Sequence, residues 1–271
     1  MDSFISVGGR QFQVDVSSPI DISIPISFNN TQLNFFGVPN AKAAPYEKGN
    51  TQGSTELGGG CNFDTISLIP HCHTTHTECV GHIVNEPIYI NQFPLNGLRS
   101  AYLITVEPEA VLDKNEKHSK YHEVSDEVIT GSQLENAIGE VNLEIEVLIV
   151  RTLPNSEKKL TMKYNENFIP PYFSSSAIEF IKKKKILHLC TDLPSIDRIL
   201  DGGTLEAHHL FWDIPLHEKS LGKSSVSPST VTELIYVSNE IEDGLYFINL
   251  QVANIDLDAA PSRPILYPVI P

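Results

Sequence analysis

Ile69-Pro-His-Cys-His-Thr-Thr-His-Thr-Glu-Cys-Val-Gly-His82 is the stretch on which the interpretation of this sequence depends. It contains four of the chain's ten histidines, together with two cysteines and a glutamate. Imidazole, thiolate and carboxylate groups are the side chains that bind divalent transition metals in proteins. The density of such groups therefore predicts a metal site, although a clustered run of this kind can also be a solvated loop.

The spacing within this stretch separates the candidate ligands into two sets. If the segment is extended, alternate side chains share a face. One face then carries Cys72, His76, Glu78 and His82. The opposite face carries His71, His73 and Cys79. We expect the first face to supply three metal ligands and one further imidazole that is suited to proton transfer.

The same residues resemble the signature of the cyclase family of metal-dependent hydrolases, to which bacterial kynurenine formamidase belongs. That signature reads His-x-Gly-Thr-His-x-Asp-x-Pro-x-His. The pair Thr75-His76 and the final His82 match it. The chain departs from it at four positions, where it has Cys72 for His, Thr74 for Gly, Glu78 for Asp and Val80 for Pro. The first ligand is therefore either Cys72, which the extended register favours, or one of the imidazoles of His71 and His73.

Two later motifs resemble the remainder of the family's metal site. Ala207-His208 matches an Ala-His pair whose histidine is a ligand. Glu233 lies between apolar residues, where an isolated charge is rare unless it is paired or bound to a metal. The resemblance thus implies one or two ions, Zn²⁺ or Mn²⁺, held by Cys72, His76, Glu78, His208 and Glu233. Glu78 is the candidate bridge, and His82 is the expected catalytic acid–base group.

Two aspartates in Thr191-Asp-Leu-Pro-Ser-Ile-Asp197 also resemble a family motif, Asp-x-x-Ser-x-Asp. Aspartate is favoured in turns and at helix N-termini for local reasons. We therefore expect Asp192 and Asp197 to have turn or capping roles rather than to contact the metal.

The resemblance extends from about residue 19 to residue 267 and implies one α/β domain over residues 1–271. The implied fold is the swivelling β/β/α type, with mixed sheets and helices packed outside. Apolar alternation predicts strands at residues 4–14, 19–27, 61–69, 100–106, 142–152, 186–190, 230–234 and 246–252. Capping boxes at Ser132 and Ser176 predict two helices. Residues 29–60 are predicted to be loop, and the Pro-rich end, 261–271, to run over the surface or onto a partner.

Composition restricts the classes of partner. A net charge of −15 argues against nucleic acid, because phosphate binding requires a basic surface. No apolar stretch approaches the roughly 20 residues that span a bilayer, so no membrane partner is expected. The N-terminus lacks a basic, then apolar, signal pattern, which leaves the cytoplasm as the expected location. Four cysteines in 271 residues do not predict a disulfide framework.

The function that the resemblance implies is hydrolysis of an amide bond in a formyl-amide or cyclic small molecule, as by an arylformamidase. A bound metal ion lowers the pKa of water from about 16 towards 7 and so supplies hydroxide. A homodimer or homotetramer is expected. Two alternatives remain: an inactive binding protein with this fold, and a structural zinc protein whose four-ligand shell is closed.

Overall fold

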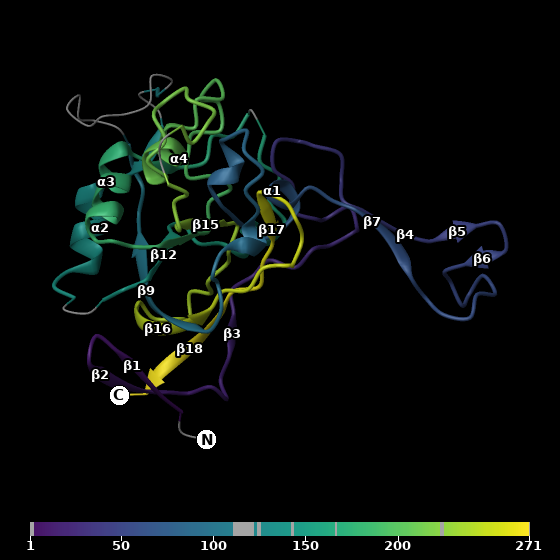
Figure 1. The fold of residues 1–271 in the computed structure, drawn as a ribbon, viewed down its shortest axis with the longest axis horizontal. Coiled ribbons are helices and arrows are strands. Elements are labelled where there is room, and N and C mark those ends of the chain that lie inside the picture. Colours follow the sequence, from purple (N-terminus) through teal and green to yellow (C-terminus); the bar gives the residue numbers. More distant parts are fainter. Residues whose placement is uncertain are drawn as a thin grey trace.

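The computed structural model describes residues 3–110, 122–123, 126–141, 144–165, 167–222 and 225–270 (Figure 1). Its main sheet has 11 strands. These are β1 (Ser3–Val7), β2 (Arg10–Val14), β3 (Ile20–Asp21), β8 (His76–Glu78), β9 (Leu98–Val106), β12 (Val147–Thr152), β14 (His188–Thr191), β15 (Thr230–Glu233), β16 (Gly244–Asn249), β17 (Ala259–Pro261) and β18 (Ile265–Ile270). The order is β1-β2-β18-β16-β9-β12-β14-β15-β8-β17, and β3 pairs with β18.

The helices and the remaining strands are short. The helices are α1 (Pro70–His73), α2 (Gly131–Ile138), α3 (Ser175–Lys183) and α4 (Glu206–Phe211), with 3-10 turns at Val80–His82, Ile90–Gln92 and Glu157–Thr161. The small strands are β4 (Lys42–Pro45), β5 (Glu47–Lys48), β6 (Thr51–Gln52), β7 (Asp64–Ser67), β10 (Glu109–Ala110), β11 (Glu127–Ile129) and β13 (Tyr172–Phe173). This mixed α/β architecture agrees with the fold class expected from the sequence.

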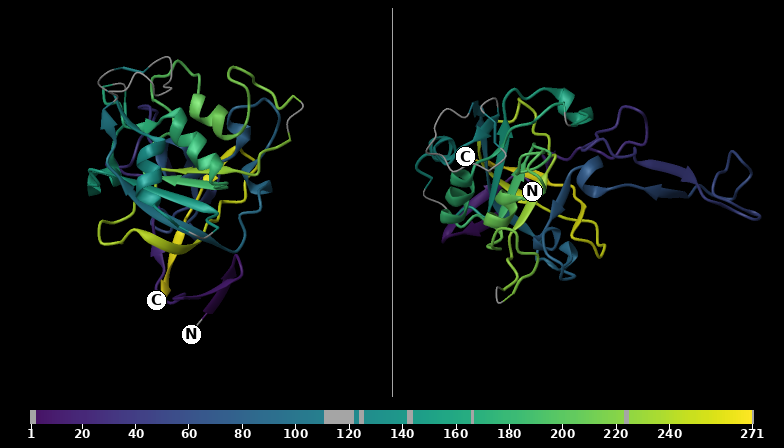
Figure 2. Two further views of the ribbon diagram at one scale, coloured as in Figure 1. Left: turned by 90° about the vertical axis from the view of Figure 1, so that its left-hand side faces the viewer. Right: turned by 90° about the horizontal axis from the view of Figure 1, so that it is seen from above.

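The centre of the sheet is parallel, with β12 between β9 and β14, and β15 beyond β14. Every residue of β12 is buried, as its continuous apolar run predicts. Alternate side chains enter different cores: Leu148 and Val150 pack with the residues of α2 and α3, whereas Ile149 packs with Ile22 and Ile235 on the other face. The helices therefore cover one face of the sheet (Figures 1 and 2).

The predicted helices are present, but each begins two residues earlier than its predicted cap would require. The capping box of α2 is formed by Thr130 and Gln133, and α3 is capped by Ser174, whose side chain accepts from the Ala177 N–H. Thr130 and Ser174 have the extended backbone that an N-cap requires. Ser132 and Ser176 lie inside the first turn, so the predicted boxes at those residues are wrong.

Three other predictions differ from the structure. The stretch 19–27, predicted to be a strand, contains only the two-residue β3. The stretch 29–60, predicted to be loop, contains β4, β5 and β6. The Pro-rich end does not run over the surface, because β17 and β18 belong to the main sheet. The side chain of Leu266 is fully buried in the core behind β16. The free energy of this burial favours the sheet position, although the prolines provide no backbone N–H for hydrogen bonds.

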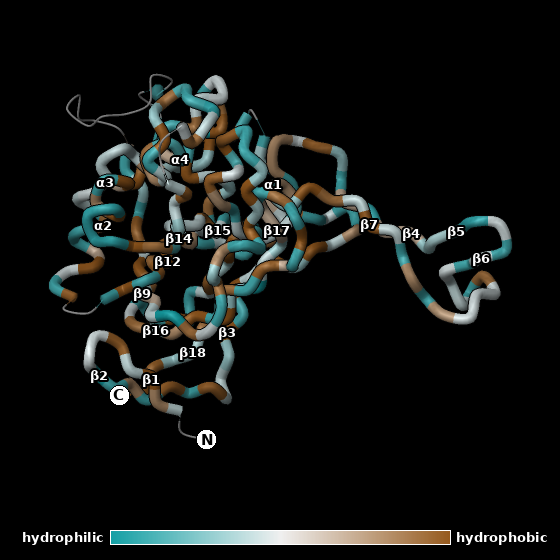
Figure 3. Tube along the Cα trace, viewed as in Figure 1, coloured by the Kyte–Doolittle hydropathy of each residue, from teal (hydrophilic) through white to brown (hydrophobic). Residues whose placement is uncertain are grey.

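Residues Lys42–Ser67 form an arm that projects from the rest of the protein (Figures 1 and 2). Its base is the antiparallel pair β4–β7, with Lys42 opposite Ser67 and Pro45 opposite Asp64. Its far part contains the short pair β5–β6. The tube in Figure 3 shows hydrophobic stretches along this arm as well as in the body.

Two expectations from composition can be compared with the structure. All four cysteines are free thiols, in agreement with the absence of a disulfide framework. Among the described residues, no helix has both the length and the apolar character needed to cross a bilayer.

Candidate metal centre

Strand β8 carries the centre of the candidate site. It lies between β15 and β17 in the sheet, so that His76 is opposite Glu233 on one side and Pro261 on the other. His76 and Glu78 are two residues apart on a strand and therefore project from the same face. Both are fully buried. The alternation expected from the sequence is confirmed for these two residues.

The expectation of one extended segment from residue 72 to residue 82 is wrong. Residues Pro70–His73 form a helical turn, and extended backbone begins at Thr74. Proline is favoured at the first position of a helix, since its φ angle is already helical and it needs no donor there. The helical turn changes which side chains face the site: His71 turns towards Glu78, whereas Cys72 does not.

Cys72 packs in an apolar cluster with Leu33, Phe35 and Leu234. Burial, with a contribution from the negative charge of Glu233, raises the pKa of its thiol to about 11. Its sulfur belongs to none of the groups of potential ligand atoms found among the described residues. His73 is also directed elsewhere: its Nδ1 accepts from the Ile69 N–H at 2.9 Å, and its Nε2 lies 3.1 Å from the Pro39 carbonyl oxygen.

Glu78 is the carboxylate around which the imidazoles gather. Its Oε1 lies 2.6 Å from His208 Nε2. Its Oε2 lies 3.5 Å from His71 Nε2 and 3.8 Å from His82 Nε2. His71, His76 and Glu78 offer one ligand atom each within 4.8 Å of one another, and so do Glu78, His82 and His208. A third such group consists of His71, His82 and Asp258, so the three groups overlap around Glu78 and His71.

Glu233 closes the other side of the centre. Its Oε2 lies 3.4 Å from His76 Nε2, and its Oε1 accepts from the Ile196 N–H at 2.8 Å. His76 Nδ1 lies 3.1 Å from the Thr74 carbonyl oxygen. A carbonyl can only accept, so Nδ1 carries the proton and Nε2 presents its lone pair to the centre.

His208 reaches the centre from α4 and is oriented by Asp197. The Asp197 carboxylate accepts from His208 Nδ1 at 2.6 Å and from the backbone N–H of Ala207 at 2.7 Å. The expected capping role of Asp197 is confirmed, and it also fixes the ring of His208. Asp192 is not a turn or cap residue: it accepts from the N–H of Thr152 at 2.9 Å and pairs with Lys159 at 2.7 Å.

The imidazoles and carboxylates of this cluster shift one another's pKa values. Burial alone would raise the pKa of Glu78, but the imidazoles of His82 and His208 hold it well below its usual range. Burial alone would lower the pKa of His208, yet Glu78 and Asp197 raise it well above its usual value. Burial alone would lower the pKa of His71, yet the neighbouring carboxylates of Asp258 and Glu78 raise it to about 10. The carboxylates thus stabilise positive charge at this position.

Three buried atoms in the cluster lie within ion-pair distance of neighbouring groups but make no well-formed hydrogen bond: His71 Nε2, His76 Nε2 and Glu78 Oε2. Buried polar atoms are normally satisfied, so such a group requires an explanation. A divalent cation held by these residues would satisfy such groups. Nitrogen and oxygen donors of this kind suit both zinc and manganese. The residues present therefore fit a divalent metal ion.

His82 and His71 share a partner that sequence reasoning missed. Asp258 Oδ2 lies 3.0 Å from His82 Nδ1 and 3.1 Å from His71 Nε2. Asp258 directly precedes β17, and its carbonyl accepts from the Cys79 N–H at 3.1 Å. In the sequence it follows Asn254-Ile-Asp-Leu, which is typical of an ordinary polar turn, so nothing marked it as part of a site.

A cavity of about 90 Å³ adjoins the centre. Its lining includes Glu78, His82 and His208 as well as the aromatic side chains of Phe35 and Phe36. Arg198 also lines it and is held by Asp126, with Nε at 2.7 Å from Oδ2. A larger cavity of about 420 Å³ is lined by His209 but by none of the potential ligands, so the donor chemistry rather than size locates the site.

Comparisons with known proteins show that the fold of this chain is similar to those of several solved structures. A solved potential metal-dependent hydrolase with cyclase activity is similar to the chain at 15% identity, with a TM-score of 0.60, over 92% of this chain and 97% of the other. A predicted metal-dependent hydrolase from Bacillus stearothermophilus gives 15% identity and a TM-score of 0.57, over 92% and 98%. An isatin hydrolase bound to the product analogue thioisatinate gives 13% identity and a TM-score of 0.61, over 93% of both chains. A comparison with curated protein sequences gave no match.

Buried imidazole and carboxylate groups that converge beside a cavity are the arrangement of a metal-dependent enzyme. The chain belongs to the putative cyclase family, whose sequence profile matches residues 14–198. This membership agrees with the resemblance of its histidine-rich stretch to the cyclase family.

Proposed function

We propose that this protein hydrolyses an amide bond, in a formyl-amide or a cyclic amide, at the centre formed by His71, His76, Glu78, His208 and Glu233. The observation that carries the proposal is the convergence of unsatisfied ligand atoms on Glu78, beside a cavity that His82 also lines. His71 here takes the position that the sequence assigned to Cys72.

The cation that these residues fit is Zn²⁺ or Mn²⁺. When bound, such an ion activates water at neutral pH and polarises the substrate carbonyl. The chain's own contribution is to hold the ligands in place: Asp197 fixes His208, the Thr74 carbonyl fixes His76, and the Ile196 N–H fixes Glu233. Partners of this kind orient ligands and tune their basicity.

His82 is the proposed acid–base group. Its Nδ1 lies 3.0 Å from the Asp258 carboxylate, which can only accept, so in the neutral ring Nδ1 carries the proton. Its Nε2 then has a free lone pair, 3.8 Å from Glu78 Oε2 and beside the cavity. From this position it can take a proton from water and return it to the departing nitrogen of the amide.

The substrate class rests on the cavity and on similar proteins. Phe35 and Phe36 supply an aromatic wall for a flat ring. One structurally similar protein is an isatin hydrolase, and isatin is a cyclic amide. A structural zinc site has a closed ligand shell with no open position for a substrate. A cavity beside the centre therefore favours a catalytic role over a structural one.

Assays of the metal-loaded protein with two substrates test the proposal. N-formylaniline should release formate, or isatin should open to its carboxylate, and a chelator should abolish the reaction. The protein as purified should contain at least about one equivalent of metal, consistent with a tightly held ion. Matched protein with His76→Ala should lose both metal and activity. Full metal content with neither substrate hydrolysed would contradict the amide-hydrolase proposal, whereas no metal uptake would contradict the metal centre itself.

We also propose that the chain self-associates through the arm, Lys42–Ser67. Both faces of the arm are exposed to solvent. Every residue of β7 is exposed, and the side chains of Ile66 and Leu57 are 55% and 63% exposed. An isolated two-stranded ribbon is at best marginally stable in water, which favours a covering partner. Among the described residues, four of the 16 exposed large hydrophobic side chains lie in this short arm: Tyr46, Leu57, Phe63 and Ile66.

Charge favours a second copy of this chain as that partner. The arm has two lysines and three acidic residues, a net charge of −1, while the rest of the chain has −14 of the total −15. Two chains repel each other through the negative charge that lies outside their arms. An interface between them is therefore favoured at a segment that is nearly neutral. A two-fold arrangement adds a second arm to the same interface.

Removal of the arm should convert a dimer or higher assembly into a monomer. Lys42 and Ser67 are paired across the ribbon, so residues 43–66 can be replaced by Asn-Gly, which closes a tight hairpin turn. Light scattering after size exclusion should give a multiple of 30.0 kDa for the full chain and a single mass for the excised protein. Leu57→Ser with Ile66→Ser should weaken association, and Val226→Ser, which changes an exposed residue of the body, should not. A monomeric full chain, or an unchanged assembly after excision, would overturn the proposal.

A further inference from the structure

Two consecutive residues of the segment 192–205 each hold a different proposed metal ligand. The backbone N–H of Ile196 donates to Glu233 Oε1 at 2.8 Å. The carboxylate of Asp197 lies 2.6 Å from His208 Nδ1. The segment connects β14 to α4 and contains neither helix nor strand, so regular backbone hydrogen bonding does not fix its position. Its position therefore depends on tertiary contacts.

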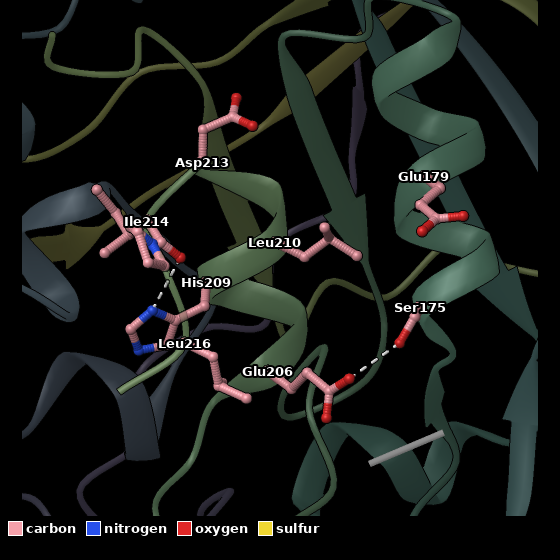
Figure 4. Close-up of a pocket in the computed structure, with 9 residues that line it drawn as sticks. Ser175, Glu179, Glu206, His209, Leu210, Asp213, Ile214 and Leu216 are labelled. Atoms are coloured by element: carbon pink, nitrogen blue, oxygen red, sulfur yellow. Dashed lines mark hydrogen bonds between the residues drawn. The ribbon is translucent and has the colours of Figure 1, made fainter. Parts of the chain in front are cut away.

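The helix α4, which carries His208, has an anchor of its own. Figure 4 shows the Ser175 hydroxyl donating to the Glu206 carboxylate, at 3.2 Å, which ties the first turn of α4 to α3. The backbone N–H groups of Ala207 and His208 donate to Asp197 at 2.7 and 3.1 Å. The helix is thus held by α3 and by Asp197, whereas Asp197 itself belongs to the irregular segment.

Arg198 follows Asp197 and makes a forked ion pair with Asp126. Its Nε lies 2.7 Å from Asp126 Oδ2 and its Nη2 3.2 Å from Oδ1, while its Nη1 donates to the Leu200 carbonyl at 2.8 Å. The side chains of Arg198 and Asp126 are only 4% and 3% exposed. Charge-assisted hydrogen bonds in such a fork are strong and fix geometry. Removal of Arg198 would leave the Asp126 carboxylate buried without this counter-charge.

Asp126 is held in turn by the small sheet beside the segment. It directly precedes β11, and its Oδ2 accepts from the Tyr172 hydroxyl of β13 at 3.0 Å. Strands β11 and β13 pair in parallel. The backbone N–H of Phe173, also in β13, donates to the Ile196 carbonyl at 3.0 Å. Ile196 is therefore bonded to β13 through its carbonyl and to Glu233 through its N–H.

We infer that Arg198 is a positioning residue of the metal centre, which acts through the two residues that precede it. Its ion pair with Asp126 holds the segment 192–205 where Ile196 and Asp197 meet their ligands. Partners outside the ligands themselves commonly contribute about 10–100-fold to metal affinity. The inference rests on the proposed metal centre but not on the identity of the substrate.

A contact with substrate is the alternative role, because Arg198 also lines the cavity of about 90 Å³ beside the centre. Two observations favour positioning. The charge of Arg198 is compensated by Asp126, and three of its N–H donors are used within the chain. A substrate contact would affect KM, whereas positioning affects the affinity for the metal.

Zinc affinity, measured by competition with a chelator, tests the inference on the folded protein without any substrate. Arg198→Met removes the guanidinium and keeps an aliphatic side chain. It should weaken Zn²⁺ binding by about tenfold or more, the usual effect of losing an outer partner of a ligand. The visible absorption bands of the cobalt-loaded protein should shift as well, because His208 and Glu233 would be held less firmly.

Two further variants separate positioning from a general effect on stability. Arg99→Met breaks another arginine–carboxylate pair, with Glu146 at 2.7 Å, near the N-terminal ends of β9 and β12. The segment 192–205 follows the C-terminal end of β14, which is parallel to them, so this pair lies at the opposite end of the strands. Arg99→Met should leave Zn²⁺ affinity and the cobalt spectrum unchanged. Tyr172→Phe, which removes only one hydroxyl, should fold and weaken Zn²⁺ binding less than Arg198→Met.

Three results would overturn the inference. The first is Zn²⁺ binding by Arg198→Met and Tyr172→Phe as tight as that of the intact protein. The second is an equal loss of affinity in Arg99→Met. The third is a raised KM in Arg198→Met with unchanged Zn²⁺ affinity, which would assign Arg198 to substrate binding. If the intact protein itself bound no Zn²⁺, the proposed metal centre would be contradicted, and the inference with it.

Discussion

His82→Ala should lower turnover by about 10²–10⁴-fold, the usual effect of losing an acid–base group, and leave the metal content near normal. The reason is positional. His82 lies at the edge of the centre and lines the cavity, and among the described residues its side chain is at hydrogen-bond distance from Asp258 alone. The proposed ligand atoms, His71 Nε2, His76 Nε2 and Glu78 Oε2, belong to other residues and remain present without it.

Elemental analysis and turnover measured on the same preparation test this prediction. Asp258→Asn should reduce turnover less than His82→Ala, because the ring would remain but lose the carboxylate that fixes its tautomer. His217→Asn is a suitable control, since His217 is exposed and has a left-handed backbone that asparagine tolerates. If His82→Ala removes the metal instead, His82 is a ligand and the division of roles is wrong.

His71→Ala should reduce metal content and activity together, whereas Cys72→Ser should retain both. The helical turn Pro70–His73 brings His71 Nε2 to 3.5 Å from Glu78 Oε2 and places the Cys72 thiol in an apolar cluster. A buried cysteine of this kind behaves as a small hydrophobic residue. Cys72→Ser therefore costs some stability but no ligand.

Cobalt substitution distinguishes the two possibilities directly. Thiolate coordination to Co²⁺ produces a strong sulfur-to-metal charge-transfer band in the near ultraviolet, and imidazole coordination does not. We expect the cobalt protein to lack that band and its spectrum to be unchanged by Cys72→Ser. A strong band that disappears in Cys72→Ser would restore the assignment made from the sequence.

The residue types of the centre could be predicted from the sequence because most of them lie in one short stretch. His76 and Glu78 occupy a strand, where a spacing of two residues places side chains on one face, and the structure confirms this for both. The strands β9 and β12 were predictable for a related reason, since the burial of their apolar residues follows from runs of such residues in the sequence. The predicted positions of the two helix caps were wrong by two residues. More than one hydroxyl residue lies near the start of each helix, and only the backbone geometry decides which of them is the N-cap.

Three features depended on the tertiary structure alone. A helical turn begins at Pro70 and directs His71, rather than Cys72, towards the site. The helix propensity of these four residues was too weak to predict that turn from the sequence. Asp258 lies 176 positions from its partner His82, so no spacing rule connects them. The cavity beside His209 exists only because α3 and α4 pack together. The sequence by itself determined which chemical groups are present and which face of each strand they occupy, whereas packing between distant segments decided which of them meet.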